Sequence, residues 1–407
     1  MRRITVNGAI PLVGEVKVSG SKNAALPIIF ACITARGISE IKGLPDIGDV
    51  RVSLKILEKF GAQIRREGDF TYIDTEHLVY TVPDPSLISN IRASTYLIGS
   101  CLSRFGKCHI LPYGGCNFSQ RPIDMHIDAC TTLGAAIEGD KITAKRLCGA
   151  KIHFNKKSVG ATVNALLLSA TAYGDTVIEG AASEPHIDAL VDFLRSAGAN
   201  ISRQGDSFFV KGSELHGGKI AVIGDMIEAG SYLAAGLITD GRVRVTSCPV
   251  SHMDSILHFL RTLGAKIAHS EDTVEVEMTD KCSFTTVTAS PYPGFPTDLQ
   301  PIVAPLMAKF SGGRICDTVW RERFGYLQSL SSFGVNYSLS DFCATVGKSK
   351  IVPSTATSPD LRGGMACLLC ALSAEGKSEI YSADVILRGY ENLTSKLCAI
   401  GAEIKIE

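Results

Sequence analysis

The segment Leu133-Gly134-Ala135-Ala136-Ile137 is one copy of a pattern that recurs six times along the 407 residues of the chain. In each copy a hydrophobic residue is followed by a glycine, then by Ala (Val in one copy), and then by a short strand-like stretch. The other copies are Phe60-Gly61-Ala62-Gln63-Ile64, Ala197-Gly198-Ala199-Asn200-Ile201, Leu263-Gly264-Ala265-Lys266-Ile267, Phe333-Gly334-Val335-Asn336-Tyr337 and Ile400-Gly401-Ala402-Glu403-Ile404. Successive glycines are 73, 64, 66, 70 and 67 residues apart. This regular spacing predicts a fold built from six similar units.

Each glycine of the pattern is interpreted as the residue after a helix, where a left-handed backbone closes the last turn, and a strand follows it. Upstream in every copy lies a second helix that is apolar nearly all round, which is typical of a buried helix. These segments begin at Asn23, Ala93, Ala161, Ala229, Leu299 and Gly363. Each unit is therefore predicted to run helix, strand, helix, strand, strand, with helices inside and sheets outside.

Units of this size favour two closed α/β domains of three units each over a solenoid, whose repeats are usually shorter. We expect the first domain to span residues 20–223 and to carry the Cys116 loop. The second domain is expected to combine residues 1–19 with residues 224–407, because the strands near Ile4 and Gly14 have no helix before them. These N-terminal strands are predicted to complete the sixth unit. The active site is expected in the cleft between the domains.

Composition argues against several classes of protein. The formal net charge is zero and the pI is about 7.1, so the chain has no global field to hold nucleic acid or an acidic membrane surface. The apolar run from Ala24 to Ala35 is too short to span a bilayer and contains Pro27, and the first residues do not resemble a signal peptide. These features predict a cytoplasmic protein.

The 13 cysteines are an odd number scattered through a long chain, so most are expected to be reduced. Cys367 and Cys370 form a C-x-x-C motif within an apolar helical run. Because no second pair or histidine follows at zinc spacing, we interpret both as small core residues.

The residues that open the six apolar helices indicate an anion site. They are Ser21-Lys22-Asn23, Arg92-Ala93-Ser94, Lys156-Lys157-Ser158, Asp225-Met226-Ile227-Glu228, Pro296-Thr297-Asp298 and Asp360-Leu361-Arg362. A helix start offers free amide hydrogens and partial positive charge, which suit a phosphate. Cations at such starts, as at Lys22 and Arg362, indicate an anion that offsets their repulsion. For Thr297 and Asp360, ordinary helix capping is an equally good interpretation.

A second candidate site is the segment Gly114-Gly115-Cys116, which lies between a predicted strand at His109 and a predicted helix near Asp124. Two glycines before a cysteine indicate a loop, and Arg121 nearby would favour the thiolate. A cysteine in such a loop is often unremarkable when it is considered alone. Beside the cationic helix starts, Cys116 becomes a candidate for catalysis.

The chain resembles the UDP-N-acetylglucosamine 1-carboxyvinyltransferase family of the EPSP synthase superfamily, whose members catalyse the first committed step of bacterial peptidoglycan synthesis. The resemblance covers nearly the whole chain and depends on the order and spacing of several motifs. These are Gly20-Ser21-Lys22-Asn23, Arg92-Ala93-Ser94, Gly114-Gly115-Cys116, Arg121-Pro122-Ile123-Asp124-Met125-His126, Ser158-Val159-Gly160, Phe295-Pro296-Thr297-Asp298, Arg323-Phe324, Asp360-Leu361-Arg362 and Arg388-Gly389-Tyr390-Glu391.

The resemblance implies two inside-out α/β barrels and transfer of the enolpyruvyl group of phosphoenolpyruvate to the 3′-hydroxyl of UDP-N-acetylglucosamine. The phosphoenolpyruvate site that it implies consists of Lys22, Asn23, Arg121, Arg323, Arg362 and Arg388. The implied UDP-N-acetylglucosamine site consists of Arg92, Arg121, Pro122, Ile123, Asp124, Met125, Lys156, Lys157, Ser158, Val159, Asp298 and Val319. No metal or organic cofactor is implied.

The resemblance also assigns catalytic roles. Cys116 matches the proton donor to the methylene carbon of phosphoenolpyruvate, and Asp298 matches the group that takes the proton from the sugar hydroxyl. Lys22, Arg121 and Arg388 would stabilise the carboxylate and the leaving phosphate as charge develops.

The chain departs from the family pattern at Met226, Arg321-Glu322, His186 and Leu387. These positions are expected near the hinge and behind the residues that contact substrate, so closure, affinity or the orientation of Arg388 would be affected. They leave open a catalytically weak paralogue that binds UDP-N-acetylglucosamine as a sensor. The enzymatic alternative is 3-phosphoshikimate 1-carboxyvinyltransferase, which shares the six-unit fold but lacks the Gly-Gly-Cys loop.

Overall fold

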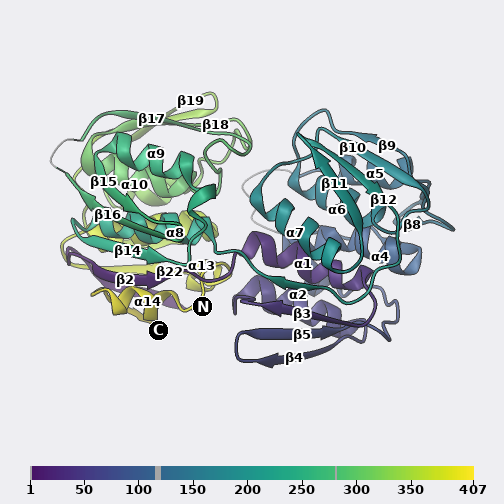
Figure 1. The fold of residues 1–407 in the computed structure, drawn as a ribbon. Coiled ribbons are helices and arrows are strands. Elements are labelled where there is room, and N and C mark those ends of the chain that lie inside the picture. Colours follow the sequence, from purple (N-terminus) through teal and green to yellow (C-terminus); the bar gives the residue numbers. More distant parts are fainter. Residues whose placement is uncertain (1, 115–120, 280–281) are drawn as a thin grey trace. The chain divides into compact units, whose positions relative to one another are not determined.

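The computed structural model describes residues 2–114, 121–279 and 282–407. Cys116, predicted as a catalytic residue, lies outside these described residues. The chain divides into two compact units (Figure 1). We call residues 20–114 and 121–223 the Lys22 unit, and residues 2–19 together with the described residues from 224 to 407 the Asp298 unit.

The Lys22 unit contains three repeats. Its helices are α1 (Lys22–Thr34), α2 (Gly48–Lys59), α3 (Pro85–Ile88), the 3₁₀ helix η1 (Arg92–Tyr96), α4 (Leu97–Phe105), α5 (Asp124–Thr132), α6 (Val159–Ser169) and α7 (Pro185–Ser196). Its strands are β3 (Ile38–Lys42), β4 (Gln63–Glu67), β5 (Phe70–Asp74), β6 (Lys107–His109), β7 (Ala136–Glu138), β8 (Lys141–Thr143), β9 (Lys151–His153), β10 (Asp175–Glu179), β11 (Asn200–Gln204), β12 (Ser207–Lys211) and β13 (Lys219–Ala221).

The Asp298 unit contains the other three repeats. Its helices are α8 (Met226–Ile238), the 3₁₀ helix η2 (Val250–His252), α9 (Asp254–Leu263), α10 (Gln300–Phe310), α11 (Tyr326–Ser331), α12 (Leu361–Ser373), α13 (Ala383–Ile386) and α14 (Leu393–Ala399). Its strands are β1 (Arg3–Asn7), β2 (Val13–Lys17), β14 (Arg242–Thr246), β15 (Ala265–His269), β16 (Thr273–Met278), β17 (Thr285–Ala289), β18 (Gly313–Asp317), β19 (Tyr337–Ser340), β20 (Cys343–Val346), β21 (Thr355–Thr357), β22 (Lys377–Tyr381) and β23 (Glu403–Ile406).

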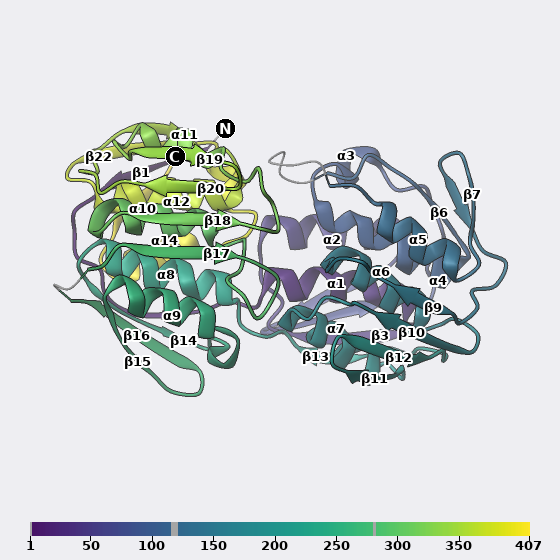
Figure 2. The ribbon, with the colours of Figure 1, turned by 90° about the horizontal axis from the view of Figure 1, so that it is seen from above.

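The sheets confirm the predicted order of elements in the repeat. In the sheet β15-β16-β14-β2, for example, the strand β14 after the inner helix α8 pairs antiparallel with β16, and the neighbouring hairpin strand β15 pairs with β16. The sheets β13-β3-β5-β4, β11-β12-β10-β9 and β17-β18-β20-β19 repeat this arrangement. Figure 2 shows, for each unit, helices enclosed by such outer sheets. The predicted α/β fold with inner helices and outer sheets is therefore correct.

The glycines that define the repeat adopt the predicted left-handed backbone. Gly61, Gly134, Gly198, Gly264, Gly334 and Gly401 have φ angles of 100°, 95°, 103°, 121°, 84° and 103°. An L-residue with a side chain rarely adopts these angles, which explains why glycine recurs at this point in all six copies.

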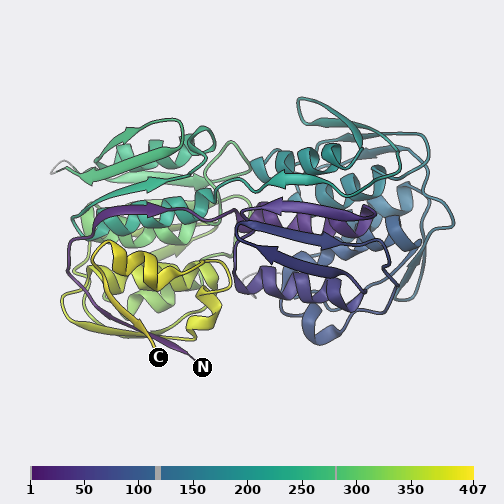
Figure 3. The same cartoon turned by 60° about the horizontal axis from the view of Figure 1, so that its bottom comes forward.

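The N-terminal strands enter two different sheets of the Asp298 unit. Strand β1 pairs with β22 and β23, so it completes the sixth repeat as predicted. Strand β2 was predicted in the same repeat, but it pairs in parallel with β14 of the fourth repeat instead. The backbone of Arg3 bonds to that of Glu407, and the two ends of the chain accordingly lie side by side (Figure 3).

Helix α1 shows why the inner helices are apolar on all sides. Every residue from Ala24 to Thr34 is buried, because neighbouring helices and sheets surround this helix. The apolar run that the sequence contains here is thus part of the core of the Lys22 unit. Within the described residues, no helix combines the length and the hydrophobicity that a membrane crossing needs.

The inner helices α4 and α6 approach closely at Gly99. The backbone N–H of Gly99, in the first turn of α4, donates a 2.7 Å hydrogen bond to Oδ1 of Asn164 in α6. This bond satisfies one of the amides that a helix start leaves without an intrahelical partner. A Cβ atom on Gly99 would lie 2.7 Å from the same Oδ1 and 3.0 Å from the Asn164 carbonyl oxygen. The packing of the two helices therefore requires glycine at this position.

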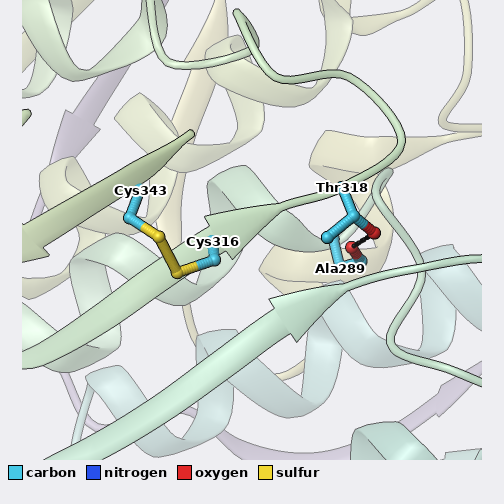
Figure 4. Close-up of a disulfide and its surroundings, with 4 residues drawn as sticks. All are labelled: Ala289, Cys316, Thr318 and Cys343. Atoms are coloured by element: carbon cyan, nitrogen blue, oxygen red, sulfur yellow. Dashed lines mark hydrogen bonds between the residues drawn. A yellow bond between two sulfur atoms is a disulfide. The ribbon is translucent and has the colours of Figure 1, made fainter. Parts of the chain in front are cut away.

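One pair of cysteines is oxidised, whereas ten other described cysteines are free, so the expectation that most are reduced is met. Cys316 of β18 and Cys343 of β20 face each other across antiparallel strands and form a disulfide (Figure 4). Cys367 and Cys370 are fully buried in α12, which confirms that they are core residues. Burial raises the pKa of the Cys367 thiol to about 12.

We predict that Gly99→Ala lowers the free energy of unfolding by about 1–3 kcal/mol, because the added methyl group overpacks the contact between α4 and α6. Gly325→Ala is the matched control, since a Cβ atom there meets nothing within 4 Å. Urea unfolding of both variants measures the difference. Equal stability of the two variants would contradict the requirement for glycine at position 99.

Candidate functional site

The starts of the inner helices in the Lys22 unit lie at one end of that unit. Thr34 at the end of α1, Arg104 near the end of α4 and Thr171 just after α6 all line one pocket, so the C-terminal ends of these helices gather there. Because the three helices also contact one another along their lengths, their first residues gather at the opposite end. This end carries Lys22, Arg92 and Ser158, as the sequence predicts.

Lys22 is held at the start of α1 by an acidic partner. Its Nζ lies 2.8 Å from Oδ2 of Asp49 in α2, and Asp49 is only 3% exposed. Ser21 caps the helix by accepting from the N–H of Ala24, and Asn23 is half-buried beside it. The sequence prediction missed Asp49, whose carboxylate supplies charge that offsets the cation at this helix start.

Arg92 and Arg121 come together within the second repeat, from the start of η1 and from the segment before α5. Nη2 of Arg92 donates a 2.5 Å hydrogen bond to the carbonyl oxygen of Arg121, and both arginines act electrostatically on the buried Tyr96. Burial lowers the pKa of Arg92, which nevertheless stays charged because an arginine titrates far above neutrality. The result is a concentrated positive charge beside the start of η1.

His126 connects this positive charge to the start of α6. It is 5% exposed, its Nδ1 lies 2.7 Å from Nδ2 of Asn164, and its ring would collide with any side chain at position 160. The amide NH₂ donates, so Nδ1 accepts and the ring is neutral with its proton on Nε2. Burial, together with the nearby Arg92, lowers the pKa of His126 to about 4.

The predicted nucleotide-sugar residues around α5 and α6 differ in their surroundings. Ser158 caps α6 by accepting from the N–H of Ala161, and Val159 is the first residue of that helix. Lys157 points instead to Asp206 and to the carbonyl oxygen of Ala181, at 2.6 and 2.9 Å. The remaining predicted positions are exposed at Lys156, Pro122 and Asp124 and half-buried at Ile123 and Met125.

In the Asp298 unit, Asp298 lies between two buried arginines. Its Oδ1 accepts from Nη1 of Arg323 at 2.9 Å, and its Oδ2 accepts from Nη2 of Arg362 at 3.1 Å. The side chains of the arginines are 5% and 3% exposed, whereas that of Asp298 is 28% exposed. The carboxylate is therefore fixed from behind and presents its open side to solvent. Asp298, predicted for the nucleotide-sugar site and for catalysis, is thus in direct contact with two arginines predicted for the phosphoenolpyruvate site.

Asp317, at the end of β18, organises the segment around this carboxylate. It is fully buried and accepts hydrogen bonds from the backbone N–H groups of Val319 and Trp320 at 2.9 and 2.7 Å. Its second oxygen accepts from the Thr297 hydroxyl at 2.5 Å, and that hydroxyl in turn accepts from Arg323. Burial raises the pKa of Asp317. The sequence prediction missed this residue.

The two residues for which capping was an alternative behave differently. Asp360 caps α12, because its Oδ1 accepts from the N–H groups of Arg362 and Gly363. Thr297 does not cap a helix: α10 begins only at Gln300, and the Thr297 hydroxyl donates to Asp317. The capping interpretation therefore holds for Asp360 alone, and Thr297 belongs to the Asp298 cluster.

Arg362 is the most enclosed cation of the site. Its guanidinium lies 5.6 Å from the ring centroid of Tyr390, whose hydroxyl is 2.8 Å from the Ser231 hydroxyl of α8. Among the described residues, its Nη1 is buried and lacks a hydrogen-bond partner. The half-buried Arg388 follows α13, two residues before Tyr390. An anion that reached Nη1 would complete the hydrogen bonding of Arg362.

The positions that depart from the family pattern are not part of this cluster, and one of them, His186, belongs to the Lys22 unit. Met226 is the first residue of α8 and packs with Leu387 against the hydrophobic core of the Asp298 unit. Arg321 stacks on Phe342, and Glu322 is exposed. His186 is buried in α7 of the Lys22 unit.

A metal centre is not evident in the part of the chain that the structure describes, where no group of three or more His, Cys, Asp or Glu side chains is arranged to hold an ion. Each unit by itself gathers cationic groups around a single carboxylate: the Lys22 ammonium meets Asp49 in one, and the Arg323 and Arg362 guanidinium groups meet Asp298 in the other. Such groups suit phosphate and carboxylate ligands.

Comparison with known proteins agrees with this chemistry. The family model described as EPSP synthase (3-phosphoshikimate 1-carboxyvinyltransferase) matches residues 6–397. A protein of Halothermothrix orenii named UDP-N-acetylglucosamine 1-carboxyvinyltransferase is 37% identical, with 100% of this chain and 99% of that protein covered. A protein of Streptococcus mutans named UDP-N-acetylglucosamine 1-carboxyvinyltransferase 2 is 38% identical with the same coverage.

Among solved structures, the enolpyruvyl transferase NikO from Streptomyces tendae matches with a TM-score of 0.90 at 25% identity, covering 100% of this chain and 99% of that one. An EPSP synthase from Acinetobacter baumannii matches with a TM-score of 0.73 at 16% identity over the whole of both chains, which is a likeness of fold. Together with the sequence relatives, these structures confirm the resemblance on which the predicted family depends.

We predict that His126 makes the protein less stable in mild acid. Its folded-state pKa of about 4 lies below the usual 6.5, so only the unfolded chain binds this proton at intermediate pH. The contribution of His126 to the free energy of unfolding, roughly 3 kcal/mol, is complete above about pH 6.5 and is lost as the pH falls towards 4. His126→Asn should flatten the decline in a series of denaturant titrations. An imidazole that titrates near 6.5 by NMR would contradict the assignment.

Proposed function

The chain belongs to the EPSP synthase (3-phosphoshikimate 1-carboxyvinyltransferase) family, and we propose that it transfers an enolpyruvyl group to UDP-N-acetylglucosamine as a step of peptidoglycan synthesis. The observation that carries this proposal is the likeness, over the full chain, to relatives named for that acceptor. The cationic starts of α1 and η1 and the carboxylate of Asp298 support it chemically.

Phosphoenolpyruvate is the proposed donor. Its phosphate and carboxylate require several cations, and Lys22, Arg121, Arg362 and Arg388 are proposed to supply them, with Arg323 and Asn23 beside them. Lys22 is positioned for this role by its pairing with Asp49, and the unpartnered Nη1 of Arg362 is available for a carboxylate oxygen. Arg92, the segment from Arg121 to Met125, the segment from Lys156 to Val159, and Val319 are proposed to bind the nucleotide sugar.

The proposed reaction is addition followed by elimination. The 3′-hydroxyl oxygen bonds to C2 of phosphoenolpyruvate while Asp298 accepts the hydroxyl proton and Cys116 donates a proton to C3. Loss of a proton from C3 then expels inorganic phosphate from C2 and leaves the enolpyruvyl ether. The cations around the phosphate stabilise the charge that develops as it leaves.

The geometry of Asp298 suits an acceptor of that proton. Two arginines hold both of its oxygens, so the carboxylate is oriented before substrate binds, and its side chain remains 28% exposed. Asp317 supports the arrangement indirectly, because its bond to Thr297 fixes the residue before Asp298. Preorganisation of this kind is the main way in which a site with no resident cofactor lowers a barrier. We propose the cytoplasm as the location of the reaction.

We predict that the protein releases phosphate from phosphoenolpyruvate only when UDP-N-acetylglucosamine is present. A coupled phosphate assay with UDP-N-acetylglucosamine or shikimate 3-phosphate as acceptor measures this directly. Release with shikimate 3-phosphate alone would contradict the proposed acceptor. Binding of UDP-N-acetylglucosamine without any release would favour a sensor, the alternative that Met226, Glu322 and Leu387 leave open.

We predict that Cys116→Ala reduces turnover while leaving UDP-N-acetylglucosamine binding within about threefold, and that it abolishes alkylation by an epoxide phosphonate. Cys116→Asp should retain turnover, because a carboxylic acid also donates a proton. The control is Cys148→Ala, which removes an exposed thiol. Mass spectrometry of the labelled variants reports the site. Labelling that persists in Cys116→Ala and disappears in Cys148→Ala would place the reactive thiol elsewhere.

A further inference from the structure

The Lys22 unit has a polar pocket at the opposite end of its inner helices from Lys22. Its volume is about 940 Å³, and the residues that line it come from the C-terminal ends of α1, α4 and α6 and from the adjoining loops. We call it the helix-end pocket. Since α1 rises about 1.5 Å per residue, the pocket lies roughly 18 Å from the start of that helix. It is therefore separate from the groups that the proposed reaction uses.

The charge of the helix-end pocket is strongly unbalanced. Five cationic side chains line it, against two carboxylates: the cations are Arg36, Arg104, Lys145, Arg146 and Lys211, and the acids are Asp175 and Glu214. Among the described residues, no ion pair joins any of these cations to either acid. The C-terminal ends of the helices and, at Arg104, the nearby Glu76 offset part of this positive charge, and the rest is left to solvent or to a ligand.

Arg36 and Arg104 both line the pocket. Burial lowers the pKa of Arg104 and the charge of Arg36 lowers it further, whereas Glu76 acts in the opposite direction. Arg104 is held rigidly, because it donates to the carbonyl oxygens of Thr75 and Glu76 at 2.8 and 3.0 Å. Arg36 is exposed and free to turn towards a ligand. Guanidinium groups that line one pocket can bind a phosphate through charge-assisted hydrogen bonds.

Two residues that line the pocket carry hydroxyl groups without a partner. The Oγ1 atoms of Thr34 and Thr171 are buried and, among the described residues, have no hydrogen-bond partner. Thr34 is only 5% exposed, so burying its hydroxyl costs desolvation free energy that no hydrogen bond offsets. Because each oxygen is almost inaccessible from the pocket, a bound oxyanion could accept from it only after the threonine side chain turned towards the pocket.

The rim of the pocket adds a flat surface. The guanidinium of Arg146 lies 3.5 Å from the ring centroid of Tyr173, and Tyr173 is 66% exposed. Stacked arginine and tyrosine planes of this kind accommodate a heterocyclic base. The pocket is open to solvent, and its volume is large enough to hold a small organic ligand.

We propose that the helix-end pocket binds a nucleoside polyphosphate, with its phosphates at Arg36, Arg104 and the Thr34 hydroxyl and its base at the Arg146 and Tyr173 planes. This site is distinct from the proposed substrate site. The helices α1, η1–α4 and α6 connect the two, because each begins at a candidate substrate residue and ends at this pocket.

The test uses magnesium-free ATP as the probe and isothermal titration of the full chain. ATP is expected to bind the wild-type protein and Lys22→Gln alike, and to bind Arg36→Gln/Lys145→Gln at least tenfold more weakly. Arg65→Gln is the control, since Arg65 is an exposed arginine of the same unit that lies outside the pocket and pairs with Glu67. Inorganic pyrophosphate that displaces ATP completely, with equal affinity, would show that the base makes no contribution and would overturn the assignment of a nucleoside.

Thr34→Val separates a ligand role for the hydroxyl from a structural one. Because the hydroxyl has no partner in the described structure, the variant is expected to have an unchanged or higher melting temperature and at least threefold weaker ATP binding. A lower melting temperature with unchanged ATP affinity would overturn the proposal. So would an absence of ATP binding to the wild-type protein, binding that Lys22→Gln removes, or an equal loss in Arg65→Gln.

Discussion

A helix that is apolar on every side must be surrounded by protein, and this constraint determines the arrangement of both units. The inner helices α1, α4 and α6 of the Lys22 unit, like α8, α10 and α12 of the Asp298 unit, meet it by packing against one another inside outer sheets. The backbone N–H and C=O groups without an intrahelical partner then lie only at the two ends of each helix. At the starts, Ser21, Ser158, Asp225 and Asp360 satisfy backbone amides with their own side chains. The remaining amides and the neighbouring cations are left for a ligand.

The cations at or near these starts have different carboxylate partners. Lys22 has the buried Asp49 as a partner, and Arg323 and Arg362 share the carboxylate of Asp298. A buried charge is tolerated only when it is paired and hydrogen-bonded, so each pairing keeps a cation in place until an anion arrives. Asp317 acts indirectly on the Asp298 cluster. It accepts hydrogen bonds from the Thr297 hydroxyl and from the backbone N–H groups of Val319 and Trp320. The candidate site is therefore organised before substrate binds.

The repeat, the buried helices and the left-handed glycines were predictable because each depends on local sequence. Residues that act through distant contacts were not. Asp49 and Asp317 look like ordinary acids in the sequence, and only the fold brings them to Lys22 and Thr297. The pairing of β2 with β14 and the bridge between Cys316 and Cys343 depend on the register of strands, which the alternation of side chains does not reveal. Thr297 and Asp360 both precede apolar helices in the sequence. Only Asp360 caps its helix, because α10 does not begin until Gln300.

The central claim is that the cationic helix starts and Asp298 serve the formation of an enolpyruvyl ether on a nucleotide sugar. Its most direct test is ¹³C NMR of the product made from [2-¹³C]phosphoenolpyruvate and UDP-N-acetylglucosamine. The account predicts a labelled vinyl ether carbon with a long-range coupling to the sugar proton at C3′. A labelled carbon attached at another hydroxyl, or no new carbon signal while UDP-N-acetylglucosamine is bound, would contradict it.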